Sequence, residues 1–341
     1  MVKSFFAVDI KAPYAYACLD DSAKKDREKM TDDIREEIQR LKKERGAIIL
    51  AHNYQLPQVQ DIADFTGDSL ELARVGTDVK ESVIVFCGVH FMAETCAMMS
   101  PEKTVLLPDE TSGCPMADMA DGEGLRAMKA AHPGAVVVTY VNSTAEVKAL
   151  SDVCCTSANA VSIVERIPPD RDIIFVPDKY LGGHVSRITG RKMILWDGYC
   201  PTHARILVEH VEQARAAYPG APVIVHPEST GAVCLAADHA LSTGQMCAFA
   251  KNSDAKTILV GTEIGLLHRL RKENPDKTFV PLTEQALCPN MKRNTLEKIL
   301  WSLQSMTPQI RVPEKTARRA TLAVQRMFES GPILPIPDEP E

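Results

Sequence analysis

A unit that occurs three times in this sequence constrains the fold more than any other feature. In each copy a short apolar run ends in polar residues, and a hydroxyl residue follows the first of them 17 positions later. The pairs are His52 with Ser69, Tyr140 with Ser157, and His226 with Thr243. Their first members lie 88 and 86 residues apart. A repeat of this length, built from alternating strand and helix patterns, predicts three α/β units with parallel sheets.

Three Cys-Pro steps follow the same spacing. Cys114, Cys200 and Cys288 lie 86 and 88 residues apart, and each follows the polar strand end of its unit by 60 or 62 residues. Ten cysteines and 22 prolines among 341 residues would rarely place three such steps in register by chance. One interpretation is an inherited turn with a small buried thiol, because cysteine is often buried. The other is that three thiolates, one from each unit, converge on a metal centre.

The residues leave the nature of that centre open. No Cys-x-x-Cys occurs, so the usual zinc-ribbon and ferredoxin spacings are absent. Three thiolates suit a [4Fe–4S] cluster in which one iron lacks a protein ligand and acts as a Lewis acid. A zinc site is the alternative, with His203 as a fourth ligand three residues after Cys200. The other cysteines do not recur in register and are expected in the core, although Cys154 and Cys155 beside Ser157 could be reactive.

Polar side chains at the three strand ends form the candidate chemical site. Functional loops lie at the carboxyl ends of parallel strands, so three units that face one axis would bring these side chains into a common pocket. The residues are His52, Asn53 and Tyr54 in the first unit, Tyr140 and Asn142 in the second, and His226 and Glu228 in the third. They supply the imidazole, phenol, amide and carboxylate groups of acid–base chemistry. Taken singly, each could instead cap a strand or fill a polar core position.

Hydroxyl residues are expected to open the helices that follow. Ser69, Ser157 and the pair Ser242-Thr243 would act as N-caps that satisfy free backbone N–H groups. Helix N-termini also bind anions, so three of them aimed at one pocket would suit a substrate with several carboxylates or a phosphate. The sequence has no glycine-rich nucleotide loop, so ATP or NAD chemistry is not indicated.

The order of the patterns predicts the extent of each unit. The first unit opens with a helix that Thr31 caps and Gly46 ends, and each unit contains three predicted strands. One helix is expected over 204–217, and another is expected to be capped by Asn294. We divide the chain into an N-terminal arm at 1–30, repeat units at 31–131, 132–217 and 218–305, and a C-terminal helix with a loose proline-rich tail at 306–341.

Composition limits the function classes. The chain is 45% apolar and 25% charged, as in an ordinary globular protein with a sizeable core. Its net charge of −6 gives no reason to expect nucleic-acid binding. The apolar runs are too short to span a membrane, and Asp9 interrupts the apolar start, which argues against a signal peptide. Ten cysteines without a secretory signal indicate a reducing compartment, so we expect a cytoplasmic protein.

A series of short motifs runs along the chain in the order AHNYQ, GDSLELAR, GVHFMAE, CPMA, YVNS, CTSAN, CPTH, HPE, STGQM, GTEIG and CPNMK. In this order they resemble the quinolinate synthase family, the iron–sulfur enzymes of de novo NAD biosynthesis. The resemblance extends from about residue 32 to residue 330, and the combination is specific although no single motif is. In two places the chain departs from some members: Ser229 replaces a cysteine after HPE, and Met291 and Asn294 replace cysteines near the third Cys-Pro. Thiol–disulfide regulation at that place is therefore not expected.

The resemblance implies a fold of three pseudo-symmetric, three-layer α/β/α domains with parallel sheets around a central active site. It implies a [4Fe–4S] cluster on Cys114, Cys200 and Cys288, with the fourth iron facing the substrate. The implied reaction condenses iminoaspartate with dihydroxyacetone phosphate to give quinolinate, phosphate and water. The implied substrate contacts are His52, Ser69, Tyr140, Asn142, Ser157, His226, Glu228 and Thr243, and the implied catalytic residues are Tyr54, His226 and Glu228. Transient contact with the L-aspartate oxidase that supplies iminoaspartate is a further implication.

Two other functions stay open on the residues alone. An iron–sulfur hydro-lyase acting on a small polycarboxylate would use the same open iron, but it would need no phosphate subsite. An assay with dihydroxyacetone phosphate separates these two enzymes. A non-catalytic iron–sulfur or zinc sensor would need a partner surface or a DNA-binding element, and the sequence shows no basic recognition helix.

Overall fold

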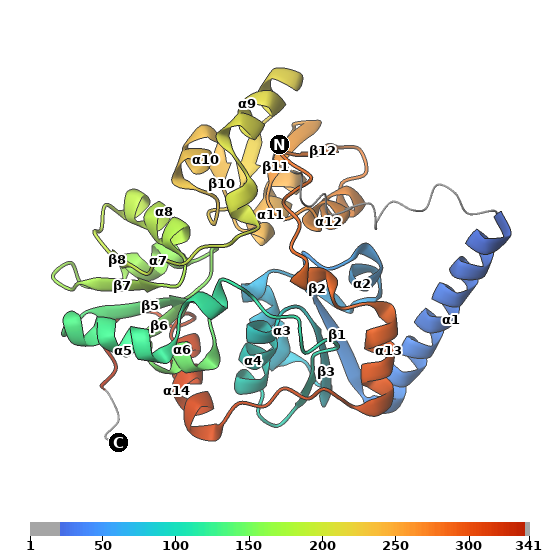
Figure 1. Ribbon diagram of the computed structural model, residues 1–341, viewed down its shortest axis with the longest axis horizontal. Helices are drawn as coiled ribbons and strands as arrows, with labels where there is room; N and C mark the ends of the chain where they lie inside the picture. The colour runs from blue at the N-terminus through green and yellow to red at the C-terminus, as the bar shows by residue number, and fades with distance from the viewer. Residues whose placement is uncertain (1–20, 338–341) are drawn as a thin grey trace, which may run out of the picture.

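The chain folds into three similar α/β units arranged around a common centre (Figure 1). The computed structural model describes residues 21–337, with side chains described from residue 29 onward. Each unit contains one four-stranded sheet, all of whose strands pair in parallel in the same spatial order, with the second strand outside the first and the fourth outside the third. Helices cover the sheets, which confirms the predicted fold of three α/β/α units with parallel sheets.

The same succession of helices and strands occurs in each unit, and each succession ends in a short 3-10 turn labelled η. The first contains α1 (Asp21–Arg45), β1 (Ala47–His52), α2 (Pro57–Ile62), β2 (Phe65–Gly67), α3 (Ser69–Asp78), β3 (Val83–Cys87), α4 (His90–Met99), β4 (Thr104–Leu106) and η2 (Ala117–Met119). The second contains α5 (Gly122–Ala131), β5 (Val136–Tyr140), α6 (Ala145–Ala149), β6 (Val153–Cys155), α7 (Ala160–Glu165), β7 (Ile173–Val176), α8 (Lys179–Thr189), β8 (Ile194–Leu195) and η3 (His203–Arg205). The third contains α9 (Val208–Ala217), β9 (Val223–Val225), α10 (Gly231–Ala236), β10 (His239–Ala240), α11 (Thr243–Asn252), β11 (Thr257–Gly261), α12 (Leu266–Glu273), β12 (Thr278–Pro281) and η4 (Asn290–Lys292). Two helices follow, α13 (Leu296–Ser305) and α14 (Glu314–Gln325).

The second strand of each sheet is the element that the sequence analysis missed. β2, β6 and β10 have only two or three residues, too few to show a strand pattern. An aspartate precedes each of them, namely Asp64, Asp152 and Asp238, again 88 and 86 residues apart. The carboxylate of each accepts the backbone N–H of a residue in the first strand of its sheet, respectively Ile49, Val137 and Val223. This recurring aspartate is the sequence signal that could have located the missing strands.

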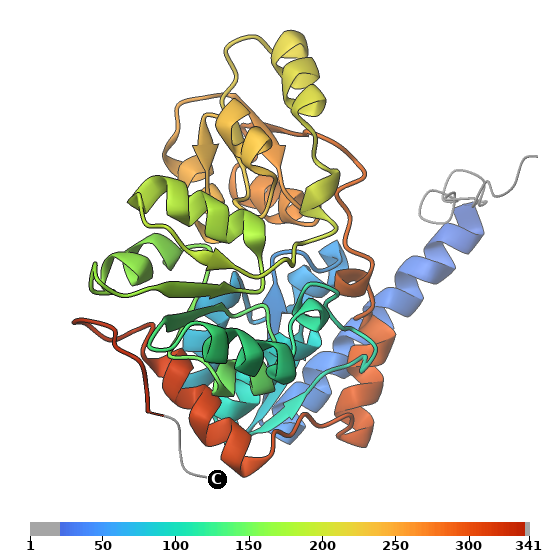
Figure 2. The same ribbon diagram turned by 60° about the vertical axis from the view of Figure 1, so that its left-hand side comes forward.

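The helix after each Cys-Pro step packs on the next unit around the ring. Leu125 of α5 lies in a core cluster with Val137 of the second sheet. α9 packs in the same way on the third sheet, in the cluster that contains Val223. After the third step, α13 packs beside α1 in the core of the first unit, where Ile299 and Ile49 share one cluster (Figure 2). The unit boundaries predicted at 131, 217 and 305 fall at the C-terminal ends of these helices. Their packing groups each helix with the unit that it contacts, which corresponds to boundaries before the helices in the chain.

Two helix boundaries differ from the prediction. α1 begins at Asp21 rather than at Thr31, because residues 21–30 are rich in helix-forming Lys, Arg, Glu and Ala and contain no Pro or Gly. The predicted arm therefore includes the first turns of this helix, and its residues 1–20 lie outside the described part of the chain. The helix expected over 204–217 divides into η3 and α9, because Ile206 leaves the helical conformation and is fully buried in the core.

The C-terminal part of the chain also differs from the prediction. Thr295, not Asn294, caps α13, and the buried Asn294 donates to the backbone carbonyl of Gly88 instead. The tail was expected to be loose, but its Ile333 is fully buried and donates its backbone N–H to Arg166. The tail therefore packs on the second unit as far as it is described, alongside α14, which contacts α6 and β6.

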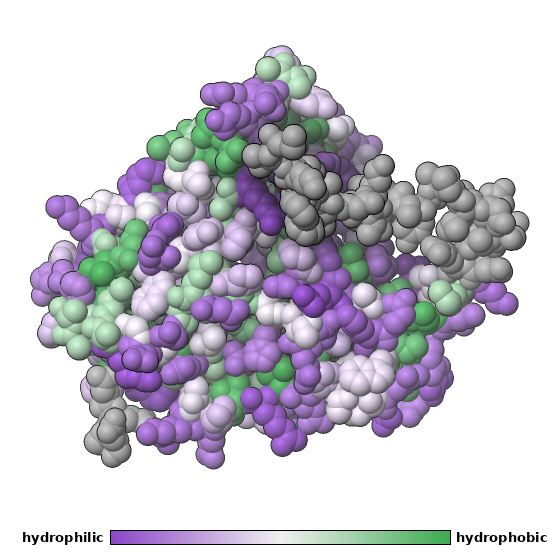
Figure 3. All heavy atoms as spheres, viewed as in Figure 1, coloured by the Kyte–Doolittle hydropathy of each residue, from purple (hydrophilic) through white to green (hydrophobic). Residues whose placement is uncertain are grey.

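The surface shows no single dominant apolar area on the face seen in Figure 3. Hydrophobic residues are scattered there in small patches among hydrophilic ones. None of the helices within residues 21–337 is both long enough and apolar enough to pass through a membrane.

Candidate active site

Twelve of the predicted site residues line one pocket where the three units meet, whereas Asn53 lies behind its wall. It has about 670 Å³ of empty space, part of it open to solvent. The twelve residues are His52, Tyr54, Ser69, Cys114, Tyr140, Asn142, Ser157, Cys200, His226, Glu228, Thr243 and Cys288. The parallel sheets explain this convergence, because each strand end and each Cys-Pro step lies on the side of its sheet that faces the centre. Geometry brings these groups together, and their chemical roles stay predictions.

The three thiols have the same local backbone. Cys114, Cys200 and Cys288 each precede one of the turns η2, η3 and η4. Backbone N–H groups at these turns donate to the sulfur atoms. The donors are Ala117 and Met116 for Cys114, His203 for Cys200, and Met291 and Asn290 for Cys288. Burial raises the pKa of all three thiols, while these N–H groups lower it. Such donors offset part of the cost of a buried thiolate, so the turn that recurs with each Cys-Pro step is compatible with a metal ligand as well as with a buried thiol.

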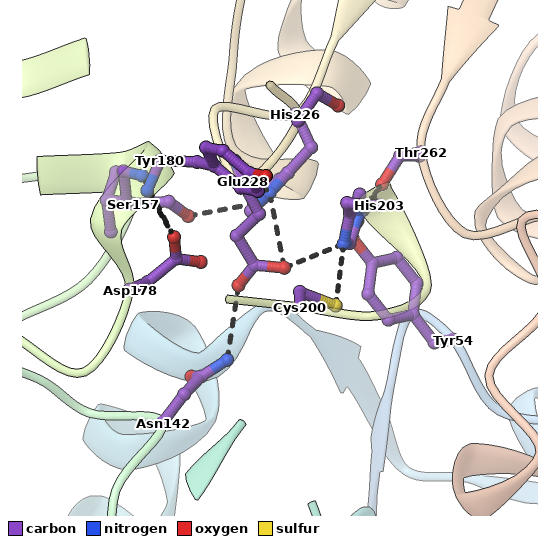
Figure 4. Close-up of polar contacts among 12 residues, drawn as sticks. Tyr54, Asn142, Ser157, Asp178, Tyr180, Cys200, His203, His226, Glu228 and Thr262 are labelled. Atoms are coloured by element: carbon purple, nitrogen blue, oxygen red, sulfur yellow. Dashed lines mark hydrogen bonds and ion pairs between the residues drawn. The ribbon is translucent and has the colours of Figure 1, made fainter. Parts of the chain in front are cut away.

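A second group of potential metal ligands overlaps the first. The ligand atoms of Cys200, His203 and Glu228 lie within 4.8 Å of one another and form a potential metal site. His203 Nδ1 is 3.1 Å from Cys200 Sγ and 2.7 Å from the nearer Glu228 oxygen (Figure 4). Imidazole, thiolate and carboxylate together suit zinc as well as iron. The position of His203 agrees with the zinc alternative from the sequence, and Glu228 is a potential ligand that the sequence analysis did not consider.

Glu228 is the centre of the polar network, as Figure 4 shows. The phenol of Tyr140 donates to its Oε1 over 2.5 Å, and Asn142 Nδ2 donates to the same oxygen over 3.2 Å. Burial opposes the charged form of Glu228, but the adjacent His203 and the hydrogen bonds from His203 and Tyr140 lower its pKa. The carboxylate is therefore ionised at neutral pH. Burial and the charge of Glu228 in turn raise the pKa of Tyr140, which stays a donor.

Two histidines have the same hydrogen-bonding pattern in the first and third units. His52 Nδ1 accepts the backbone N–H of Tyr54 over 3.2 Å, and His226 Nδ1 accepts that of Glu228 over 3.3 Å. Burial lowers the pKa of both imidazoles to about 3, so both are neutral at pH 7. A neutral imidazole that accepts at Nδ1 carries its proton on Nε2. His226 therefore donates from Nε2 to the Ser157 hydroxyl, 3.1 Å away.

Tyr54 is linked to the same network through a residue that was not predicted. Its hydroxyl lies 2.6 Å from Thr262 Oγ1 and 3.4 Å from His203 Nε2, and the latter two atoms are 2.9 Å apart. Burial and the charge of Glu228 raise the pKa of Tyr54 well above its ordinary value. Tyr54 is therefore a neutral phenol at pH 7, able to donate a proton and able to lose one only to a neighbouring base.

Ser69, Ser157 and Thr243 line the pocket, and of the predicted hydroxyl caps only Ser242 caps a helix. Ser69 and Thr243 are the first residues of α3 and α11, whereas Asp68 and Ser242 form the capping boxes. Ser157 lies in a turn before α7, whose N-cap is Asn159. The N-cap prediction is therefore confirmed for Ser242 of the third unit. It is wrong for Ser69 and Ser157, because Asp68 and Asn159 occupy the cap positions of those helices. The displaced hydroxyls face the pocket instead.

A buried ion pair supports the site from behind, and the sequence analysis missed it. Glu263 is fully buried, accepts the backbone N–H of Cys288 over 3.0 Å, and pairs with Lys292 at 2.9 Å. Lys292 also donates to the backbone carbonyl of Tyr54. The pair thus connects the backbone of Cys288 in the third unit to the backbone of Tyr54 in the first. Both residues lie in quoted motifs, GTEIG and CPNMK, so their positions were noted without a role.

The remaining described cysteines lie in the core, as expected. Cys87, Cys96, Cys154, Cys155, Cys234 and Cys247 are all buried. Burial raises the pKa of Cys154 to about 12 and that of Cys155 well above its ordinary value. Burial therefore favours the neutral form of both thiols, and their reactivity stays a prediction. Cys18 lies outside the described residues.

The fold and the pocket define a class of protein: a three-unit parallel α/β protein with acid–base groups beside a potential metal site. A family model described as "Quinolinate synthetase A protein" matches residues 36–329. The chain is 59% identical over 295 residues to a quinolinate synthase of Dehalococcoides mccartyi, covering 86% of this chain and 97% of that protein. It is 53% identical over 300 residues to that of Thermus thermophilus, covering 87% and 97%. The chain belongs to the quinolinate synthase family.

Proposed function

We propose that this enzyme condenses iminoaspartate with dihydroxyacetone phosphate to give quinolinate, phosphate and water. The observation that carries the proposal is the single pocket that combines three thiols, two neutral histidines, two phenols and an ionised carboxylate. Family membership supports the same activity and gives no support to the hydro-lyase or the sensor. The ligands are small molecules, as the size of the pocket suggests.

The metal proposed for the pocket is a [4Fe–4S] cluster held by Cys114, Cys200 and Cys288. Three thiols from three units, each with backbone N–H donors to sulfur, fit a cluster better than the single zinc that Cys200, His203 and Glu228 could hold. When bound, an iron without a protein ligand would supply Lewis acidity toward a substrate oxygen.

Proton transfer is assigned to Tyr54, with His203 and Glu228 behind it. The Glu228 carboxylate accepts from His203 Nδ1, which leaves Nε2 to face the Tyr54 hydroxyl. This order of carboxylate, imidazole and hydroxyl resembles that of other acid–base relays, in which the carboxylate fixes the tautomer. Tyr54 can then give a proton to the substrate and recover it through the imidazole. His226 acts as a donor through Ser157.

Substrate binding is assigned to the hydroxyls and to Asn142. Ser69 and Thr243 open helices at the pocket, where free N–H groups and the helix dipole favour the carboxylates and the phosphate of the substrates. The Asn142 Oδ1 is buried without a partner among the described residues. It is therefore placed to accept an N–H group of iminoaspartate.

Two wider proposals come from the chemistry of the substrate. Iminoaspartate is an imine that water hydrolyses, so we propose transient contact with the L-aspartate oxidase that forms it. A cytoplasmic location, where thiols stay reduced, would suit ten cysteines and an iron–sulfur centre.

The test begins with anaerobic purification, iron and sulfide analysis, and a visible spectrum before and after exposure to air. We expect about four iron per chain and oxygen-labile absorption. Cys200→Ser should lose the iron and the absorption. The matched control is Cys247→Ser, a buried thiol that does not recur at equivalent positions of the three units, and it should keep both. Stoichiometric zinc, or normal iron in the Cys200 variant, would refute the ligand assignment. Quinolinate formation that does not depend on dihydroxyacetone phosphate would refute the reaction.

A further inference from the structure

The side chain of Thr243 is held by a residue from a different unit. Asn53, in the turn after β1 of the first unit, places its Nδ2 3.0 Å from the Oγ1 of Thr243 at the start of α11 in the third. Asn53 is fully buried, and Thr243 is 3% exposed. Thr243 lines the pocket, whereas Asn53 does not. Any effect of Asn53 on a ligand must therefore pass through Thr243.

Arg269 fixes which end of the Asn53 amide faces Thr243. The Arg269 guanidinium lies 2.9 Å from the other end of the amide, and a guanidinium can only donate. The atom facing Arg269 must therefore be the carbonyl oxygen, which leaves the NH₂ group toward Thr243. Arg269 is itself held by the Thr66 carbonyl at 3.0 Å and by Glu273 at 2.7 Å.

Backbone contacts prevent Asn53 from turning away. Its N–H donates to the Gly67 carbonyl over 3.0 Å, and its own carbonyl accepts from Gln60 Nε2 over 3.1 Å. The backbone N–H, the backbone carbonyl and both ends of the side-chain amide of Asn53 thus all have hydrogen-bond partners when the amide NH₂ group faces Thr243. Rotation of the amide would leave Arg269 facing an NH₂ group, with two donors opposed, at a cost comparable to that of a buried unsatisfied donor.

We infer that Asn53 is a positioning residue which, oriented by Arg269, commits the Thr243 hydroxyl to donating toward an anionic oxygen of the ligand. Because Thr243 Oγ1 accepts from Asn53, its own hydrogen must point elsewhere, and no acceptor for it occurs among the described residues. The pocket is where an acceptor can be supplied. The inference rests on the proposed function only for the identity of the ligand: a phosphate or a carboxylate, both of which offer acceptors alone at neutral pH.

The opposite side of the pocket shows the same polarity, produced by different groups. Because His226 Nδ1 accepts the Glu228 N–H, Nε2 is the nitrogen that donates to Ser157, so the Ser157 hydroxyl hydrogen is also free for a ligand. His52, with Nδ1 occupied by the Tyr54 N–H, likewise carries its hydrogen on Nε2. Three groups from three units thus present hydrogens rather than lone pairs. Such a pocket selects polyanions by hydrogen-bond polarity, without a cationic side chain at these positions.

The test is Asn53→Asp, which keeps the shape and the Arg269 contact but reverses the polarity at Thr243. An aspartate oxygen would accept the Thr243 hydrogen and remove it from the ligand. Inorganic phosphate and quinolinate are titrated separately into the anaerobic holoenzyme by calorimetry, and the KM for each substrate is measured. We expect a loss of about 10- to 100-fold in affinity for one probe, as for a hydrogen bond to a charged group, with a smaller change in kcat. Loss for phosphate would assign the phosphate to Thr243, and loss for quinolinate would assign a carboxylate.

A double-mutant cycle separates polarity from added negative charge. In a Thr243→Val background, Asn53→Asp should change neither affinity nor KM by more than about threefold, because the hydroxyl that it acts on is gone. A full loss in that background would mean that charge alone repels the ligand, and the inference would be overturned. Unchanged affinity and KM in the single variant would overturn it as well. Iron content and the unfolding midpoint show that each variant is folded.

The inference and the proposed function can fail separately. If wild-type protein forms no quinolinate but Asn53→Asp still weakens phosphate binding, the polarity inference stands and the proposed reaction falls. If quinolinate forms and the variant binds and turns over as the wild type does, the reaction stands and the inference falls.

Discussion

The strand ends of the first and third units differ from that of the second, although the three share one backbone plan. In the first and third, a neutral histidine accepts the N–H of the residue two positions later and keeps its proton on Nε2. In the second, Tyr140 and Asn142 occupy the corresponding positions and both donate to Glu228 of the third unit. The strand end of the second unit therefore donates hydrogen bonds to Glu228 of the third unit, whereas those of the first and third units present N–H groups to the pocket.

The shared part of the units is structural and the unshared part is chemical. All three keep an aspartate that binds the first strand, and all three keep a cysteine before a 3-10 turn. These features fix where strands end and where sulfur atoms point. The residues that differ, above all Glu228 opposite Tyr140, break the symmetry and make one side of the pocket electrostatically unlike the other. Repetition thus supplies the scaffold, and divergence at a few strand ends supplies the reaction.

The largest effect is expected from removing the charge on which this asymmetry depends. Glu228→Gln keeps the shape but offers one oxygen where three donors now converge, so its NH₂ group must oppose His203, Tyr140 or Asn142. The tautomer of His203 would no longer be fixed, and we expect turnover to fall about 10²- to 10⁴-fold. Single-turnover quinolinate formation measures this.

The control for that variant is Glu284→Gln, an exposed carboxylate of the same unit, with iron content and unfolding midpoint measured for both. Turnover of Glu228→Gln within a few-fold of the control would show that the asymmetry of the strand ends is not catalytic.

A second prediction concerns the shared aspartates, which are not equally buried. Asp152 is 2% exposed and accepts two backbone N–H groups, from Val137 and Ile336, whereas the Asp238 side chain is 40% exposed. Asp152→Ala should cost about 2–4 kcal/mol of unfolding free energy and Asp238→Ala about 1 kcal/mol, because only the former leaves two backbone donors, one of them buried, without an acceptor. Urea denaturation monitored by circular dichroism gives both values. Equal losses of unfolding free energy in the two variants would show that each aspartate stabilises the protein only through its hydrogen bond to the first strand.

The two aspartates should also respond to pH with opposite sign. Burial raises the pKa of Asp152, so its native form binds more protons than the unfolded chain and its contribution to stability falls as pH rises above 3.8. Burial opposes ionisation of Asp238 too, but the hydrogen bonds from Arg215 and the Val223 N–H lower its pKa. Its contribution is therefore present above 3.8 and is lost as pH falls through the native pKa. The difference between wild type and each Ala variant, followed from about pH 3 to 6, should shrink for Asp152 and grow for Asp238.

Much of the fold and of the pocket could be predicted because both follow from the period of the repeat. Equivalent residues of parallel units lie at equivalent sheet edges, so the spacing of His52, Tyr140 and His226 was enough to place them together. The edge strands could not be predicted from hydrophobicity, because two or three residues carry no pattern. The position of α13 was missed for another reason: its packing on α1 is a long-range contact that closes the ring, and nothing in the local sequence states it.

The residues that support the site from behind were missed because they do not recur in the three units. Thr262, Glu263 and Lys292 hold Tyr54 and Cys288 from behind, and their importance depends on distances between units. His203 was singled out only as a possible zinc ligand, since its spacing from Cys200 was visible while its contact with Glu228 was not. Asn53 was noted as one polar residue among several, and its direction became apparent only beside Arg269.

The smallest effect is a predicted absence of change, and it tests the comparison between the strand ends directly. Burial lowers the pKa of His52 and His226 to about 3, so neither should titrate between about pH 5 and 8, where an ordinary histidine changes charge. Nitrogen NMR of histidine-labelled protein, with resonances assigned by His52→Gln and His226→Gln, should show both rings as the neutral Nε2–H tautomer throughout. His239, which is exposed on the third unit and outside the pocket, provides the internal comparison for a solvent-facing ring in the same sample. A midpoint near 6.5 for either pocket histidine would mean that the ring becomes a cation there. The hydrogens presented by the first and third units would then arise from charge, and the N–H groups of Tyr54 and Glu228 would not be what fixes them.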